Sequence, residues 1–221
     1  MNKIQQKTAY ILNLIIFALE VFAVGWMFSG ISGTAVLSAS RLGALRYFTV
    51  DSNILMGIAA LVFALEMRRV MRGEKKEISR GVYVLQLAGV TGVLLTMLVT
   101  IFFLAPTMGR IYGMGILFAY SNFFLHLANP ILSVITFVCF EKTKVLTFRD
   151  TFAGIIPLVL YTVYYTAEAL MHMENGVIQP GYDWYGFFAF GPYSMFITIP
   201  LIIVITWLIS FCLWKLNRRS A

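Results

Sequence analysis

Six long apolar runs alternate with short polar segments along the chain. The runs cover approximately residues 9–28, 47–67, 82–104, 116–140, 151–171 and 192–216. Each is about 20 residues or longer, the length that an α-helix needs to cross the hydrocarbon core of a bilayer. Helices also satisfy their own backbone groups inside lipid. The pattern therefore predicts an all-α fold, in which residues 1–221 form a single six-transmembrane-helix bundle.

The composition of the chain is also that of a membrane protein. Hydrophobic residues make up 60% of the chain and charged residues 12%, whereas soluble domains contain about 25% charged residues. The net charge is +7, and the basic residues gather between the apolar runs. That distribution is typical of a topology signal and not of a nucleic-acid surface, so we expect membrane lipids and no nucleic acid as partners.

The distribution of Lys and Arg predicts how the bundle is oriented. The N-terminal segment, the second and fourth connections and the C-terminal tail contain 14 of these residues, and the other three connections contain 3. The positive-inside rule then places both termini in the cytoplasm. The two cysteines, Cys139 and Cys212, fall toward the cytoplasmic ends of their helices, where thiols stay reduced. We find no long targeting or glycan-bearing segment, which favours a bacterial plasma membrane.

The fourth run contains a line of polar residues inside an otherwise apolar segment. Asn122, His126 and Asn129 fall at i, i+4 and i+7 and share one helix face. Pro130 follows at once, and its missing N–H predicts a kink and a free carbonyl at residue 126. An ionisable ring within a membrane helix is a candidate functional group.

The second and fifth runs contribute further polar side chains to the outer half of the bundle. Thr49 and Asn53 share a face at i and i+4, and Tyr165 and Glu168 belong to a stripe that ends at His172. We expect these groups to line one pocket with His126. A simpler alternative is that Glu168 and His172, at i and i+4, only pair with each other.

The contact between Thr49 and His126 depends on where the fourth helix begins. With a start near residue 116, His126 lies about 15 Å along its helix at the usual rise per residue, much deeper than Thr49. The two residues meet only if the fourth helix starts later, or if a helix tilts or kinks.

Short motifs resemble the androgen-induced membrane-protein family. They are the segment Arg46-Tyr-Phe-Thr-Val-Asp-Ser-Asn53, the histidine at 126 followed by Pro130 and Glu141, and Asp183-Trp-Tyr-Gly186 before the last helix. The family includes integral-membrane hydrolases of fatty acid esters of hydroxy fatty acids, and it has bacterial six-helix members. Asp51, within the first motif, is expected to interact with the helix dipole.

The resemblance implies a carboxylic ester hydrolase with a threonine nucleophile. The matching positions are Thr49 as nucleophile and His126 as its base, an arrangement in which the base removes the hydroxyl proton. Asn53, Asn122 or Asn129 would donate to the oxyanion. The expected substrate is a lipid or fatty acyl ester, and no metal or cofactor is needed.

Two other functions fit the same residues. A small proton-coupled transporter could use Glu20, His126 and Glu168 as a relay, because these ionisable groups lie within apolar runs. A non-catalytic lipid-binding scaffold would need none of them. The hydrolase requires Thr49 and His126 together, whereas the transporter should tolerate Thr49→Ala but not the loss of Glu20 or Glu168.

Overall fold

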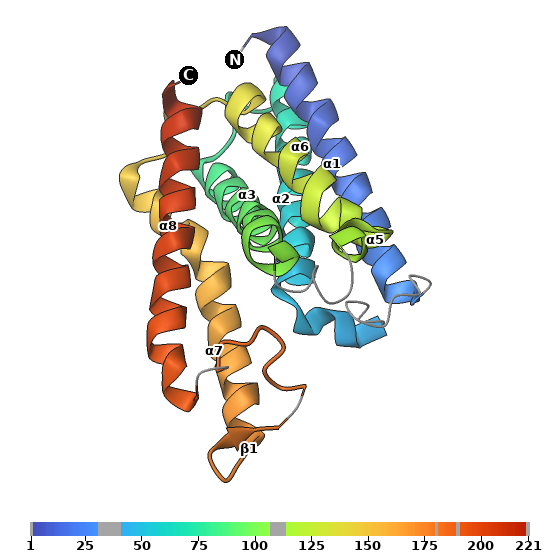
Figure 1. The fold of residues 1–221 in the computed structure, drawn as a ribbon. Coiled ribbons are helices and arrows are strands. Elements are labelled where there is room, and N and C mark those ends of the chain that lie inside the picture. The colour runs from blue at the N-terminus through green and yellow to red at the C-terminus, as the bar shows by residue number, and fades with distance from the viewer. Residues whose placement is uncertain (1, 31–40, 107–113, 180, 189–190, 220–221) are drawn as a thin grey trace.

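The computed structural model describes residues 2–30, 41–106, 114–179, 181–188 and 191–219, which are almost entirely helical (Figure 1). Six helices are long and apolar enough to cross a membrane. They are Lys3–Ser29, Phe48–Met71, Arg80–Leu104, Ser121–Phe140, Phe148–Met171 and Met195–Arg219. The predicted all-α class and the six long apolar helices are confirmed.

Three of the six helices are continuous, and the other three change their helical type along their length. The continuous ones are α1 (Lys3–Ser29), α2 (Phe48–Met71) and α8 (Met195–Arg219). The third joins α3 (Arg80–Val99) to the π-helical η2 (Thr100–Leu104). The fourth comprises α5 (Ser121–Phe123), π-helical η4 (Phe124–Ala128), α6 (Asn129–Ile135) and π-helical η5 (Thr136–Phe140). The fifth joins the 3-10 helix η6 (Phe148–Ile155) to α7 (Ile156–Met171).

The remaining elements are short and lie in the connections. Three are 3-10 turns: η1 (Arg41–Arg46), η3 (Met114–Phe118) and η7 (Pro192–Ser194). The strands β1 (Met173–Glu174) and β2 (Val177–Ile178) form an antiparallel hairpin, with Met173 opposite Ile178.

The fourth helix begins at Ser121, later than the predicted start near residue 116. Tyr120 has a φ of 54°, a left-handed conformation that an α-helix cannot contain. The turn η3 precedes it. His126 therefore lies five residues from the start of its helix. The π-helical segment η4 widens the helix just before Pro130, where the sequence predicts a kink.

Helix α1 packs on α2 through a seam of buried residues, which follow one another at alternating spacings of four and three residues along α1. The buried side chains of α1 are Ala9, Asn13, Ile16, Glu20, Ala23 and Met27. This spacing keeps one narrow stripe facing the neighbouring helix. A Cβ at Gly57 of α2 would lie 3.1 Å from the Cβ of Glu20, so glycine lets the two backbones approach at that level.

Helices α2 and α3 approach closely at two glycines. A Cβ at Gly89 would lie 3.1 Å from the Cα of Met56, and one at Gly92 would lie 3.0 Å from the Cβ of Ser52. Small residues at such crossings let helix backbones come together in membranes.

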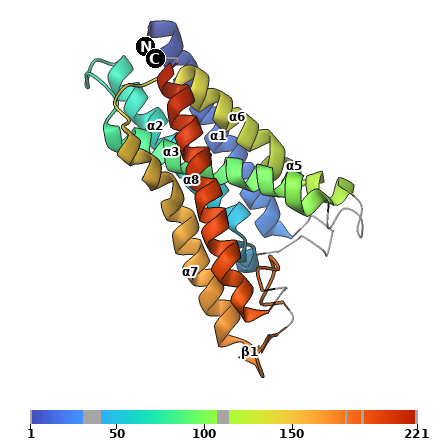
Figure 2. The ribbon, with the colours of Figure 1, turned by 60° about the vertical axis from the view of Figure 1, so that its left-hand side comes forward.

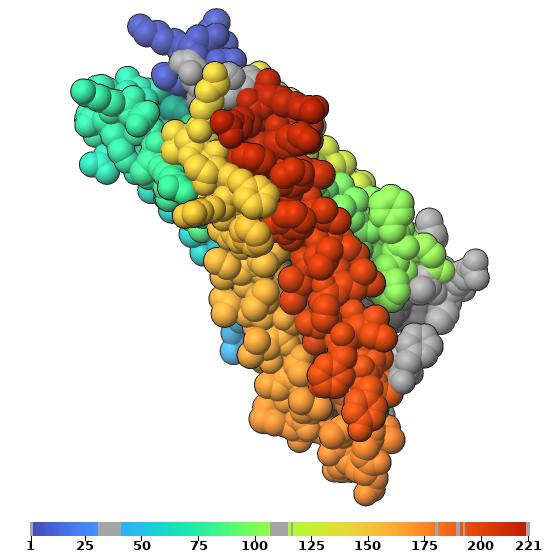
Figure 3. All heavy atoms as spheres, turned by 90° about the vertical axis from the view of Figure 1, so that its left-hand side faces the viewer, coloured from blue at the N-terminus to red at the C-terminus, as the bar shows by residue number. Residues whose placement is uncertain are grey.

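Both termini lie at one end of the bundle, and the β1–β2 hairpin lies at the other (Figures 1 and 2). Helices α7 and α8 run side by side along one outer face (Figure 3). Large apolar side chains of α8, such as Phe196, Ile197 and Leu201, are exposed there, which suits contact with lipid tails.

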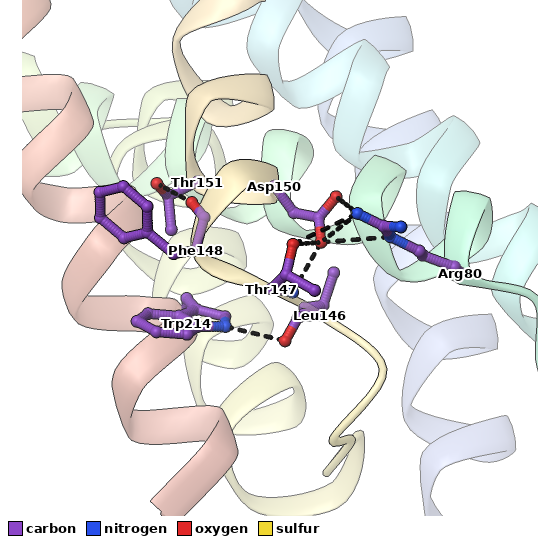
Figure 4. A network of polar contacts seen from close by, with 7 residues as sticks. All are labelled: Arg80, Leu146, Thr147, Phe148, Asp150, Thr151 and Trp214. Carbon is purple, nitrogen blue, oxygen red and sulfur yellow. Dashed lines mark hydrogen bonds and ion pairs between the residues drawn. The ribbon is translucent and has the colours of Figure 1, made fainter.

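A polar network at the end of the bundle that holds the termini joins the third and fifth helices (Figure 4). The guanidinium of Arg80 binds both carboxylate oxygens of Asp150, with a shortest distance of 2.8 Å. Asp150 Oδ2 also accepts from the backbone N–H and the hydroxyl of Thr147. Nearby, Trp214 Nε1 of α8 donates to the carbonyl of Leu146. The start of η6 is thus fixed to both α3 and α8.

Candidate functional site

A backbone carbonyl selects the tautomer of the neutral His126 ring. The ring is buried in η4, and its Nδ1 lies 2.9 Å from the carbonyl oxygen of Leu117. A carbonyl can only accept, so Nδ1 carries the proton of the neutral ring and Nε2 keeps the lone pair. The turn η3, which contains Leu117, therefore positions the ring and sets its neutral tautomer, in which Nε2 can act as a base.

Thr49 lies in the first turn of α2 and lines a small cavity between α2, α3 and α7. The cavity has a volume of about 50 Å³, room for one or two water molecules. Its walls are mainly apolar, and its polar groups are hydroxyls from Thr49, Thr96, Thr100, Thr162, Tyr161 and Tyr185. His126 is not among the lining residues.

A larger open groove runs beside this cavity. It has a volume of about 590 Å³ and lies between η1, α2 and α7. Phe48 and Tyr161 line both spaces, and their ring centroids are 5.3 Å apart. These two rings form the wall between the groove and Thr49. Asp51 lines the groove and not the cavity, so its carboxylate points away from the Thr49 side of α2.

Asn53 connects the start of α2 to η4. Its Nδ2 lies 2.7 Å from the carbonyl oxygen of Thr49 and 3.3 Å from that of Leu125. Thr49 and the residue before His126 thus lie on either side of one amide group. Within the described residues, no hydrogen bond joins the side chains of Thr49 and His126.

The two other asparagines of the predicted site lie on the fourth helix. Asn122 is buried in α5, one turn before His126. Asn129 is fully buried at the start of α6, and its Nδ2 donates to Glu20 Oε2 at 2.7 Å. The polar stripe of the fourth helix therefore faces α1 as well as α2.

The stripe on the fifth helix has a different environment. The hydroxyl of Tyr165 donates to Asp183 Oδ1, and Asp183 Oδ2 accepts from the backbone N–H of Phe188. Glu168 Oε2 lies 3.8 Å from His172 Nδ1, which is the pairing that the i, i+4 spacing permits. Neither Tyr165 nor Glu168 lines the Thr49 cavity.

Sequence reasoning missed how the connection before α8 covers the site. The Tyr185 hydroxyl accepts from the backbone N–H of Phe48 at 3.0 Å, which satisfies one of the free N–H groups at the start of α2. Trp184 Nε1 donates to the Tyr161 hydroxyl, which in turn donates to the carbonyl of Arg46. Burial raises the pKa of the Tyr185 phenol. The Asp183–Gly186 motif is the sequence signal for this cover.

Comparisons with protein-family models, curated proteins and solved structures give no match for this chain.

Proposed function

We propose that this protein is an intramembrane hydrolase of a lipid ester, with Thr49 as nucleophile and His126 as base. The observation that carries the proposal is the hydrogen bond between His126 Nδ1 and the carbonyl of Leu117. It gives a buried imidazole the tautomer that a general base needs, in the same way that an orienting acceptor does in hydrolytic triads. The motifs around Thr49 and His126, which resemble the androgen-induced membrane-protein family, support the same pair.

The chemistry follows the acyl-transfer pattern. The Thr49 hydroxyl attacks the ester carbonyl carbon while His126 Nε2 takes its proton. The tetrahedral intermediate collapses, and the histidine returns that proton to the departing alcohol, which leaves an acyl-threonine. A water molecule then attacks the acyl group with the histidine again as base. The histidine passes this proton to the departing Thr49 oxygen, and the carboxylic acid is released.

Asn53 is a positioning residue in this scheme. Its Nδ2 is directed at the carbonyls of Thr49 and Leu125. These contacts keep the first turn of α2 next to η4. The mechanism requires η4 to move so that His126 reaches Thr49, since catalytic hydrogen bonds often form fully only with substrate bound.

The two cavities suit a substrate that comes from the bilayer. The groove of about 590 Å³ is within the range of ligand sites, and its lining of Leu42, Leu45 and Leu160 suits an acyl chain. Rotation of Phe48 or Tyr161 would let the ester carbonyl pass from the groove to Thr49. The small cavity holds the hydrolytic water.

Labelling with a fluorophosphonate probe tests the proposal. Purified wild type should form a covalent adduct that mass spectrometry maps to Thr49, and both Thr49→Val and His126→Ala should abolish it. Thr100→Val is the matched control, because the Thr100 hydroxyl lines the same cavity and is buried without a partner in the described structure. Loss of labelling only in the first two variants, all eluting as folded species, supports the mechanism. Absence of labelling in folded wild type contradicts it.

A proton-coupled transporter is the second candidate, and the buried carboxylates favour it. Glu20 and Glu141 are 2% and 1% exposed, and each is contacted by side-chain amides. Protonatable groups of this kind are typical of relays. Proton-coupled uptake that survives Thr49→Val and is lost in Glu20→Gln would establish this function instead.

We further propose that both termini face the cytoplasm of a bacterial cell and that the bundle lies in the plasma membrane. The support is the excess of Lys and Arg in the termini and in the second and fourth connections. A fluorescent protein that becomes fluorescent only in the cytoplasm should fluoresce when it is fused to either terminus. The same protein inserted within the β1–β2 hairpin should not fluoresce.

A further inference from the structure

The carboxylate of Glu20 lies in the interior of the bundle with no cationic side chain to balance it. The residue is 2% exposed and sits in the seam of α1, where Gly57 of α2 makes room for it. Among the described residues, none of the ion pairs includes Glu20. A buried carboxylate is costly unless its charge is compensated, so a proton or a bound cation must neutralise it.

Three acceptor oxygens in this region have no hydrogen-bond partner in the described structure. They are Glu20 Oε1, Asn53 Oδ1 and Asn129 Oδ1, and both asparagines are fully buried. Asn53 Nδ2 contacts two carbonyl oxygens, which can only accept, so its amide orientation is fixed. Asn129 Nδ2 is directed at Glu20 Oε2. The unpartnered atoms are therefore oxygens and not amide nitrogens.

The contacts of these three residues bring them to one place. Asn129 touches Glu20 directly at 2.7 Å. Asn53 contacts the carbonyl of Leu125, one helical turn before Asn129. Asn53 also lies one turn before Gly57, the residue over which Glu20 packs. Side chains from α1, α2 and α6 are thus neighbours in the interior of the bundle.

We propose that Glu20, Asn53 and Asn129 form a binding site for one monovalent alkali cation, with Na⁺ as the ion to test. The three unpartnered atoms make an all-oxygen donor set, which hard cations prefer. A single positive charge neutralises the carboxylate, whereas a divalent ion would leave a net charge in the apolar interior. A proton on Glu20 Oε1 could donate to only one of the two amide oxygens and would leave the other unsatisfied.

The site is separate from the proposed catalytic chemistry, although Asn53 belongs to both. Cation binding involves neither the Thr49 hydroxyl nor the His126 ring. The labelling experiment on those two residues and the ion experiment below can therefore succeed or fail independently.

The test is thermal unfolding of the purified protein in detergent, in NaCl, KCl or choline chloride at equal ionic strength. A ligand that binds only the folded state raises the melting temperature with its concentration. We expect a saturable stabilisation by Na⁺ relative to choline, and equilibrium dialysis with radioactive sodium should give one ion per chain. Glu20→Gln should remove the sodium response, and Asn129→Ala should weaken sodium affinity at least tenfold. If either variant does not fold, the number of sodium ions bound per wild-type chain in the dialysis experiment tests the proposal.

Glu141→Gln is the matched control, because it removes the other buried carboxylate held by side-chain amides. Its sodium response should equal that of wild type. Equal melting temperatures of wild type in sodium and choline would show that a proton neutralises Glu20, and would overturn the proposal. A sodium response that persists in Glu20→Gln would place the ion elsewhere and would also overturn it.

Discussion

The side-chain amide of Asn53 donates across 3.3 Å to the carbonyl oxygen of Leu125, 72 positions away in the chain. The same amide holds the carbonyl of Thr49, one turn earlier in α2. One buried side chain therefore couples the first turn of α2 to the π-helical segment that carries His126. The proposed nucleophile and base share this support, although no hydrogen bond joins their side chains in the described structure.

Replacing Asn53 tests this coupling. Asn53→Ala removes two hydrogen bonds from buried carbonyls, and an unsatisfied buried polar group costs about 1–3 kcal/mol. We expect the free energy of unfolding to fall by roughly that amount, together with loss of probe labelling at Thr49. Denaturation in mixed micelles measures the first effect. Ile58→Ala, on the exposed side of the same helix, is the control and should leave labelling intact.

The two close-approach glycines give a second prediction. A methyl group at Gly89 meets the backbone of Met56 at 3.1 Å, and backbone cannot move aside as a flexible side chain can. Gly89→Ala should destabilise the protein by about 1–3 kcal/mol. Gly25→Ala in α1 has nothing within 4 Å of its added methyl, and should stabilise by about 0.5–1 kcal/mol because alanine favours the helix. A lower melting temperature for both variants would contradict the packing argument.

The six helices could be predicted because they depend on local sequence. Length and hydropathy identify a membrane-crossing helix. The late start of the fourth helix could not be predicted, because hydropathy does not register the left-handed backbone of Tyr120. Contacts between residues far apart in the chain could not be predicted either. Nothing in the spacing of Tyr165 indicates Asp183, and nothing near Asn129 indicates Glu20.

The network between Arg80 and Asp150 gives a third prediction. The Arg80 side chain is 52% exposed, whereas that of Asp150 is 9% exposed and also accepts from the backbone and hydroxyl of Thr147. Exposed ion pairs contribute about 0.2–1 kcal/mol, and a lost helix cap costs about 0.5–2 kcal/mol. Asp150→Ala should therefore destabilise more than Arg80→Ala. A double-mutant cycle in low and high salt measures the contribution of the ion pair alone. Equal losses of stability in Asp150→Ala and Arg80→Ala would contradict this prediction.

Glu141, just beyond the fourth helix, gives a prediction for pH. Its Oε1 accepts from Asn13 and Gln86, and burial raises the pKa of its carboxyl to about 8. In the unfolded chain the same group has a pKa of about 4.3. Between these two values the folded state binds the proton and the unfolded state does not. The free energy of unfolding therefore decreases as pH rises through this window, by up to about 1.4 kcal/mol per pH unit.

Thermal unfolding between pH 5 and pH 9 measures this linkage. Wild type should lose stability as the pH rises toward 8, and the loss should level off above it because both states are then ionised. Glu141→Gln keeps the shape of the group without its charge and should flatten the profile. The effect of pH on groups that do not interact with Glu141 is common to both proteins and cancels in the difference. A difference profile without slope across this window would show that the Glu141 carboxyl is ionised in the folded protein, despite its burial.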